Sequence, residues 1–287
     1  MRRGYTLIEI IITIAITGIL SVGMFKAFEA ITTRSEKDKI LSTLSIDSQS
    51  ALNQISLLLY NRAPMSVQGC TDNTSASCVP LDQATAATIL QWYGTASESY
   101  QKGNYSGFVD MNRSINPNLY TPYSDFIQIK TTQVDKWGNF NWSNNDVALV
   151  FAGVFEEGER IEPYKITMTT NDTIIFSDAL DKPSKIYEKY YLVDSAYAVT
   201  RRKDAKNLCG TKIDNFKDDN DLLLFYNYRP WNSQTLCDGN VSLLARNVNA
   251  FAAHQINGTI RLGIDMNSSV GNNKINPVRL SKQKVVF

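Results

Sequence analysis

Histidine is nearly missing from this sequence, because its 287 residues include only one, His254. The four cysteines form no Cys-x-x-Cys pair; they are Cys70, Cys78, Cys209 and Cys237. Protein zinc sites are built mainly from histidines and closely spaced cysteines, so this composition argues against a zinc site. His254 lies in an apolar and aromatic stretch, which favours a core or edge residue over a catalytic base.

Motifs of the common enzyme classes are also missing. The chain has no Gly-x-Ser-x-Gly, no His-Glu-x-x-His and no phosphate-binding loop. Carboxylates are plentiful, but no pair of them stands out as an acid and a base. The formal net charge of +1, from 29 Lys and Arg against 28 Asp and Glu, argues against an electrostatic nucleic-acid binder. We therefore expect no enzymatic activity and no nucleic-acid partner.

Glycine and proline are absent from residues 24–63, and Pro64 ends this stretch. Apolar residues recur within it at spacings near 3.6, the period of an amphipathic helix: Leu41, Leu44, Leu52, Ile55 and Leu59. We predict one continuous helix over residues 5–62, roughly 85 Å long at about 1.5 Å per residue. Its second half needs a sheet to cover the apolar stripe.

The start of this helix is apolar enough to cross a membrane. No charge occurs in residues 10–25, and residues 5–25 supply the about 20 residues that the hydrocarbon core of a bilayer requires. By the positive-inside rule, Arg2 and Arg3 place the short N-terminus in the cytoplasm. Everything after residue 26 then lies on the outer side of the membrane.

Glu9 lies inside this span, where a carboxylate is costly unless it is paired or protonated. A secretory signal would be cleaved near residues 24–27, where the sequence is a poor match, and neither a signal nor a plain signal-anchor explains Gly4 and Glu9. The stretch Arg3-Gly4-Tyr5-Thr6-Leu7-Ile8-Glu9, followed by the apolar run, resembles the leader of type IV pilins and type II secretion pseudopilins. The resemblance implies that a membrane peptidase removes residues 1–4 by cutting after Gly4 and then N-methylates Tyr5.

Glu9 is the fifth residue of the chain that such cleavage produces. In the family, this glutamate neutralises the N-terminal amine of the neighbouring subunit in a filament, so the resemblance implies a subunit-docking role for Glu9. Two alternatives stay open: a pair with the amine of its own Tyr5, four residues away, or a glutamate that rests at the headgroup level. Gly18 matches a glycine found in many of these helices, whereas Lys26 stands where a proline is often found.

The rest of the chain reads as a β-rich domain over residues 63–287. Residues 65–121 are rich in Ser, Thr, Asn, Gln and Gly and are expected to form a variable loop region with one short helix at residues 83–92. Short β-branched and aromatic runs then predict strands within residues 125–131, 146–155, 164–170, 172–177, 186–201, 221–228, 241–254 and 258–266. The expected fold class is α+β, with the long helix packed on an antiparallel sheet, which is also the pilin architecture.

The distal part of the chain carries a second, shorter resemblance. Leu244-Ala245-Arg246-Asn247-Val248 and Phe251 match a step that precedes the last strands in large minor pilins and in the minor pseudopilin of the J type. This resemblance implies a minor subunit of the filament rather than its bulk subunit.

The cysteines are even in number and follow a membrane segment, which fits disulfides formed in an oxidising compartment. Three connectivities are possible, and four buried free thiols are the alternative. We expect Cys70 to pair with Cys78 and Cys209 to pair with Cys237, because these pairings close short loops.

Charged and asparagine-rich runs offer three further candidates. The densest acidic run could hold calcium through Asp214, Asp218, Asp219 and Asp221, but a turn before a strand explains it better, since its spacing is not that of an EF-hand. We therefore expect no cofactor. The basic run at residues 201–207 is read as a solvated hairpin tip rather than a phosphate-binding patch. Three acidic-x-Asn-x-Ser sequons centre on Asn112, Asn240 and Asn267, at a frequency that chance alone can give in so Asn-rich a chain.

The resemblance to the pilin family sets the functional expectation. It implies a single-pass protein of the bacterial inner membrane with a periplasmic domain, incorporated into a pilus or pseudopilus as a structural minor subunit. The implied partners are the prepilin peptidase and N-methyltransferase, other pilins or pseudopilins, a platform protein, an assembly ATPase and a secretin. The alternatives are a competence-type minor pilin in DNA uptake and a tip adhesin.

Overall fold

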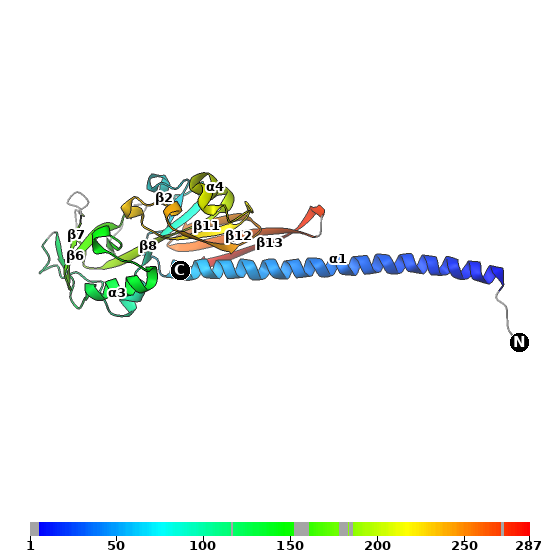
Figure 1. Ribbon diagram of the computed structural model, residues 1–287, viewed down its shortest axis with the longest axis horizontal. Helices are drawn as coiled ribbons and strands as arrows, with labels where there is room; N and C mark the ends of the chain where they lie inside the picture. Colours follow the sequence, from blue (N-terminus) through cyan, green and yellow to red (C-terminus); the bar gives the residue numbers. More distant parts are fainter. Residues whose placement is uncertain (1–5, 116, 152–160, 178–182, 184–185, 271–272) are drawn as a thin grey trace.

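A computed structural model describes residues 6–115, 117–151, 161–177, 183, 186–270 and 273–287. One long helix packs against a globular domain along its C-terminal half, and its N-terminal half projects from that domain (Figure 1). The fold is α+β and pilin-like: a long N-terminal helix followed by a curled antiparallel β domain.

The long helix α1 runs without interruption over Leu7–Tyr60, close to the predicted 5–62. Its buried residues all lie in the second half: Leu44, Ser48, Ala51, Leu52, Ile55, Ser56 and Leu59. Four of the five predicted stripe residues are among them, and Leu52, Ile55 and Leu59 are no more than 1% exposed. The fifth, Leu41, is 38% exposed and lies before the covered part of the helix. The change from exposed to buried side chains at Leu44 therefore marks where the domain begins to cover the helix.

A three-stranded antiparallel sheet covers this part of α1. Its strands are β11 (Val248–Ile256), β12 (Thr259–Val270) and β13 (Asn273–Val286), in that order. Alternate residues of β12 form the face that packs with α1 in one core: Ile260, Leu262, Ile264 and Met266. Lys282 Nζ donates to the Ser45 carbonyl oxygen at 2.8 Å, and Lys284 Nζ donates to Asn53 Oδ1 at 2.7 Å, so β13 is tied to the helix.

Ten further strands of the described residues form the second sheet. They are β1 (Gln68–Cys70), β2 (Cys78–Pro80), β3 (Ile89–Thr95), β4 (Asn118–Tyr120), β5 (Ala148–Phe151), β6 (Tyr164–Thr170), β7 (Thr173–Phe176), β8 (Tyr190–Arg201), β9 (Leu222–Tyr228) and β10 (Asn240–Ala245). The order is β2-β1-β3-β8-β5-β6-β7-β4, and β9 pairs with both β8 and β10. The buried apolar residues of the described chain form three clusters, one of them the core between α1 and β12. Strand β8 pairs with β3, β5 and β9 and supplies residues to each cluster, so it is the centre of the domain.

The described part of the domain also contains three short α-helices and five 3₁₀ turns. The α-helices are α2 (Ser97–Gln101), α3 (Phe126–Trp137) and α4 (Arg202–Cys209). The 3₁₀ turns are η1 (Ser75–Ser77), η2 (Trp142–Asn144), η3 (Gly210–Ile213), η4 (Pro230–Asn232) and η5 (Leu236–Asp238). Helix α3 lies at the end of the domain remote from the N-terminus of α1 (Figure 1).

Two predicted elements have the wrong secondary structure. The helix expected at residues 83–92 is wrong, because residues 89–95 form the inner strand β3, which is buried along most of its length. The strand expected at residues 125–131 is also wrong, because Phe126–Trp137 is the helix α3. Its buried residues Phe126, Ile129 and Gln133 follow helical spacing, which outweighs the short polar and apolar alternation.

Other predictions need smaller corrections. The expected loop region 65–121 contains strands β1 to β4 and helix α2. The basic run 201–207 is not a hairpin tip, because Arg202–Cys209 is the helix α4. Strand β13, which follows the last predicted run, was not expected from the sequence. The predicted strand at 146–155 is confirmed as β5 up to residue 151, and its remainder lies outside the described residues.

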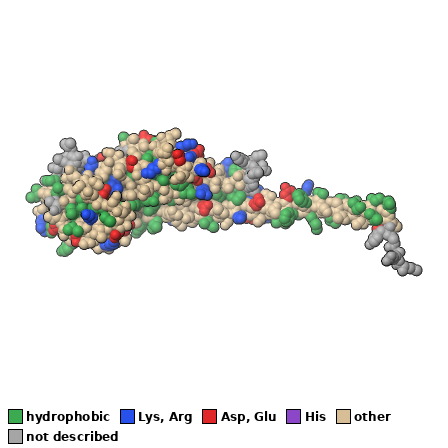
Figure 2. All heavy atoms as spheres, viewed as in Figure 1, with side chains coloured by type: hydrophobic (Ala, Val, Ile, Leu, Met, Phe, Trp, Pro, Cys, Tyr) green, Lys and Arg blue, Asp and Glu red, His purple; other side chains and the backbone are tan. Residues whose placement is uncertain are grey.

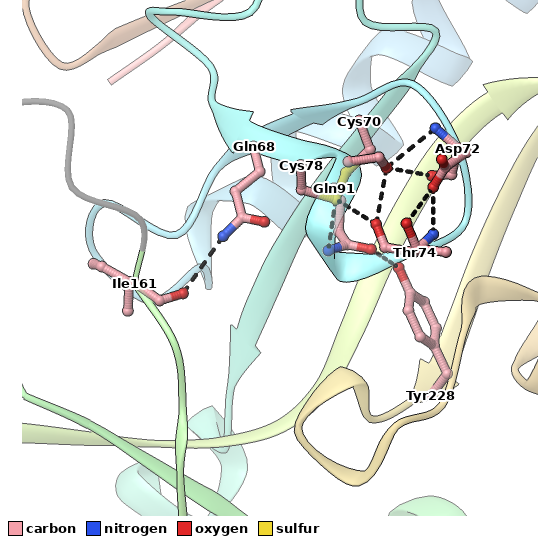
Figure 3. Close-up of a disulfide and its surroundings, with 9 residues drawn as sticks. Gln68, Cys70, Asp72, Thr74, Cys78, Gln91, Ile161 and Tyr228 are labelled. Carbon is pink, nitrogen blue, oxygen red and sulfur yellow. Dashed lines mark hydrogen bonds between the residues drawn. A yellow bond between two sulfur atoms is a disulfide. The ribbon is translucent and has the colours of Figure 1, made fainter. Parts of the chain in front are cut away.

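Both disulfides have the expected connectivity, Cys70 to Cys78 and Cys209 to Cys237. The first joins the paired strands β1 and β2 in the core, and Asp72 Oδ1 holds the loop between them by accepting hydrogen bonds from Thr74 (Figure 3). The second joins the end of α4 to η5. The bridges therefore close one short and one longer loop, with sequence separations of 8 and 28 residues.

Removing the Cys209–Cys237 bridge should destabilise the chain more than removing the Cys70–Cys78 bridge. In the loop-entropy model the longer loop contributes about 1 kcal/mol more to the free energy of unfolding. Urea unfolding of the detergent-solubilised chain, followed by tryptophan fluorescence, compares the double variants C209A/C237A and C70A/C78A. A larger loss for C70A/C78A would show that packing of these core cysteines, rather than chain entropy, dominates.

Gly94 is required by the close approach of β3 to an aromatic stack. The rings of Trp92 and Tyr197 are stacked with centroids 5.7 Å apart. A Cβ on Gly94 would lie 2.4 Å from Cε2 of Tyr197, far inside van der Waals contact. Because Tyr197 is held against Trp92, its ring cannot move away without breaking the stack.

We therefore expect Gly94→Ala to lower the free energy of unfolding by about 1–3 kcal/mol, the usual cost of an overpacked core. Gly263→Ala is the matched control, because it also lies in a strand and its Cβ would meet only the Ala252 carbonyl oxygen at 3.9 Å. Urea unfolding of both variants tests this expectation. Equal stability of the two variants would contradict the steric argument.

Candidate functional site

The candidate functional site is the N-terminal end of α1. The predicted processing residues Gly4 and Tyr5, with Arg2 and Arg3, lie outside the described residues. Thr6 is the N-cap of α1 with an extended backbone, at φ −73° and ψ 148°, and its side chain makes no capping hydrogen bond.

Glu9 lies in the first turn of α1, and its backbone N–H donates to the Thr6 carbonyl oxygen at 3.0 Å. Its side chain is exposed, and its carboxylate forms no hydrogen bond or ion pair with any residue in the described part of the chain. The partial positive charge of a helix N-terminus favours a carboxylate there but does not replace a cation. The carboxylate is therefore available to a group outside the described chain.

Three hydroxyl side chains that follow Glu9 in α1 are hydrogen-bonded to the helix backbone. The hydroxyls of Thr13, Thr17 and Ser21 each donate to the carbonyl oxygen four residues earlier, at 2.7 Å. With Glu9 they form one row at steps of four residues, which lies on one side of the helix. Glu9 differs from the other members of this row because its carboxylate, which can only accept hydrogen bonds when charged, receives none from the described part of the helix.

The surface around Glu9 is apolar and uncovered. Large apolar side chains such as Leu7 and Ile19 are 79% and 75% exposed, and Figure 2 shows hydrophobic side chains along the projecting part of the helix. An 18-residue window of α1 has a mean hydropathy of 2.2, and none of it is buried. The helix is long and apolar enough to cross a membrane, in agreement with the sequence.

The four acidic residues proposed for calcium are divided among other contacts. Asp219 pairs with Arg202, and Asp218 Oδ1 accepts from the backbone N–H of Asn220 at 2.9 Å. Asp221 is buried, and burial together with the charge of Asp218 raises its pKa. Among the residues described, no three His, Cys, Asp or Glu side chains are arranged to hold a metal, and Asp214 belongs to no such group. Calcium binding here is untested and stays a candidate.

The remaining sequence candidates do not form a site together. Arg201 and Arg202 of the basic run pair with Asp204 and Asp219, which neutralises part of its charge. His254 is exposed in β11, opposite Arg261 of β12. The sequon residues Asn112, Asn240 and Asn267 lie in an exposed turn, in β10 and in β12.

Sequence reasoning missed a buried ionic cluster between α2, α3 and β8. Lys136 Nζ lies 2.9 Å from Asp194 Oδ2 and 2.9 Å from Glu98 Oε2. Gln133 Nε2 donates to the same Asp194 oxygen at 3.1 Å. The one signal for it in the sequence is that Asp194 is the single acid in the apolar run of β8.

Comparison with known families identifies the N-terminal segment. Residues 1–25 match the prokaryotic N-terminal methylation motif. The chain thus carries a class III prepilin leader, and the long apolar helix behind it fits a pilin-like protein. No curated protein and no solved structure matches the chain.

We expect Gly4→Val to block leader removal, because the larger side chain cannot fit where the peptidase accepts glycine. In the native host, intact-mass spectrometry should show wild-type chains that begin at N-methylated Tyr5 and variant chains that keep residues 1–4. A wild-type chain that retains residues 1–4 would contradict the assignment. Cleavage after residue 24 would instead indicate an ordinary signal peptide.

Proposed function

We propose that the chain is a structural minor subunit, a pilin or pseudopilin, of a type IV filament machine. The observation that carries this proposal is a carboxylate, Glu9, that has no partner among the described residues and lies on the uncovered apolar half of α1, five residues after Gly4 in a matched methylation motif. An apolar helix without a cover in its own chain is suited to a lipid bilayer first and to the helical core of a filament afterwards.

Cleavage after Gly4 creates a positive amine that Glu9 can pair with. The proposed partner is the amine of a neighbouring subunit, because the uncovered apolar half of α1 is available to pack against other helices. The amine of its own Tyr5, four residues away, is the alternative. An unpaired charge in an apolar environment is costly for either partner, so the pair rewards one register of a subunit on the next.

The proposal also includes a cellular location and a set of partners. The helix would anchor the chain in the bacterial inner membrane, and the disulfide-bonded domain would lie in the oxidising periplasm. Partners would be the prepilin peptidase and N-methyltransferase, other pilins or pseudopilins, and the platform protein, ATPase and secretin. Such a subunit has a structural rather than a catalytic role, and it primes or caps the filament.

The kind of filament machine that the chain belongs to is a further part of the proposal. Protein secretion or pilus assembly is the proposed context, because the J-type step Leu244–Val248 points to a large minor subunit. A competence-type pilin for DNA uptake is the second candidate, but the ion pairs of Arg201 and Arg202 remove part of the basic surface it would use. A tip adhesin is the third.

Glu9→Val should leave membrane insertion and leader cleavage intact but strongly reduce co-purification with the other filament subunits. Breaking such a buried pair costs on the order of 3–5 kcal/mol, since the neighbour's amine loses its counter-charge. Cross-linking followed by affinity purification from the native host measures the recruitment. Glu9→Gln, which keeps the size of the side chain but not its charge, should give a similar loss.

Thr13→Val is the matched control, because Thr13 lies on the same row and its hydroxyl is satisfied within the helix. It should assemble like wild type. Normal assembly of Glu9→Val would show that Glu9 is only tolerated at the membrane interface. Loss of cleavage or insertion would assign Glu9 to processing instead.

A further inference from the structure

The buried cluster around Asp194 is placed by an irregularity in the central strand. The pairing of β3 with β8 passes from Gly94 opposite Ser195 to Thr95 opposite Val193, so Asp194 is the extra residue of a bulge. Bulges redirect a side chain and are common next to functional groups. Here the redirected side chain is a fully buried carboxylate in the middle of a domain.

Two helices bring the partners of this carboxylate. Lys136 comes from the last turn of α3, and Glu98 comes from α2. The side chains of Asp194, Lys136 and Glu98 are 0%, 18% and 46% exposed. Gln133, also fully buried, donates to Asp194 Oδ2. The amine therefore touches one carboxyl that is shut off from solvent and a second that is half in contact with it.

We propose that Lys136 and Asp194 form an intramolecular amide bond that links α3 covalently to β8. The side-chain nitrogen of Lys136 already lies in contact with the carboxyl group as an ion pair, with 2.9 Å between Nζ and Oδ2. Holding two reacting groups in such contact replaces a bimolecular encounter by a unimolecular step. The proposal concerns the folded domain alone and does not depend on the filament role.

The reaction is a condensation that releases one water. A proton passes from the Lys136 ammonium to Asp194, which gives a neutral amine and a carboxylic acid. The lone pair of Nζ attacks Cγ of Asp194, a C–N bond forms, and one C–O bond breaks. Of the three protons of the ammonium group, one stays on the amide nitrogen and two leave with the oxygen as water. No oxidant, reductant or activating group is consumed.

Glu98 and Gln133 have separate roles in this step. Glu98 Oε2, 2.9 Å from Nζ, accepts a proton from the attacking nitrogen, and the Glu98 carboxylate is restored when that proton leaves with the released water. The Gln133 amide donates to Oδ2 and so makes Cγ more electrophilic; it can keep this hydrogen bond to the product amide oxygen. Asp194 Oδ1 has no partner among the residues described, which suits it to be the oxygen that leaves.

Burial favours the neutral product. It raises the pKa of Asp194, and Lys136 and Gln133 offset this only in part, so the carboxyl group is shifted toward the acid that the reaction needs. For Lys136, burial lowers the pKa and the charge of Asp194 raises it, with a net rise. Proton transfer from the Lys136 ammonium to the Asp194 carboxylate is therefore the unfavourable step of the reaction. The amide then removes both charges from an environment where an ion pair is expensive.

Intact-mass spectrometry of the full chain, purified from the cell envelope and reduced to open its disulfides, tests the proposal. We expect the mass to lie about 18 Da below that of the processed sequence, the loss of one water. Proteolysis and fragmentation should then yield a branched peptide that joins Lys136 to Asp194, with no tryptic cleavage after Lys136. A chain of full mass, or a water loss that maps to another residue, would overturn the proposal.

Two variants separate the amide from other dehydrations. Lys136→Arg keeps the positive charge but should show the full mass, and a remaining water loss in it would contradict the cross-link. Glu98→Gln keeps the amine and the carboxyl in place and should show the full mass or a much slower mass loss. If Glu98→Gln cross-links at the wild-type rate, Glu98 is not the proton relay. The wild-type mass decides the main claim even where a variant fails to fold.

Discussion

Helix α1 must satisfy two environments without a break, and the rest of the molecule follows from this constraint. From Leu7 to about residue 43 its side chains are almost all exposed, and from Leu44 onward one stripe is covered by β12 and β13. No glycine or proline follows Gly23 within the helix, so the two halves form one rigid element. The domain is thereby fixed to one end of a rod whose other end is free for lipid or for other helices (Figure 1).

The position of Glu9 on the uncovered half of α1 explains the role proposed for it. The hydroxyls near it are satisfied by the helix backbone, and the apolar side chains around it have no cover in their own chain. A carboxylate with no partner among the described residues needs a positive charge from elsewhere in such a place. In the proposed function, processing of the leader matched at residues 1–25 would expose an amine that brings this charge.

Local sequence signals predicted some elements and missed others for physical reasons. The long helix was predictable because no residue between 24 and 63 can break it, and the disulfides because short loops favour local pairing. Strand β13 was missed because its lysines look solvated, although Lys282 and Lys284 reach across to the helix. Helix α3 was misread because its first residues alternate; the Asp125 cap and Gly138 after its end were the better signals. Glu9 was visible from its offset to Gly4, whereas the Lys136–Asp194 contact joins residues 58 apart and depends on a bulge that no local pattern encodes.

The distance between the Glu9 carboxylate and the N-terminal amine of a neighbouring subunit tests the central claim most directly. Solid-state ¹³C–¹⁵N distance measurements on the native complex can detect this contact when this chain carries ¹³C-labelled glutamate and the other subunits carry ¹⁵N, with Glu9→Gln used to assign the carboxyl signal. The account predicts a close contact between the Glu9 carboxyl carbon and the terminal nitrogen of another subunit, because each charge needs the other in an apolar core. An assembled complex in which Glu9 has no ¹⁵N-labelled amine within contact distance would contradict it.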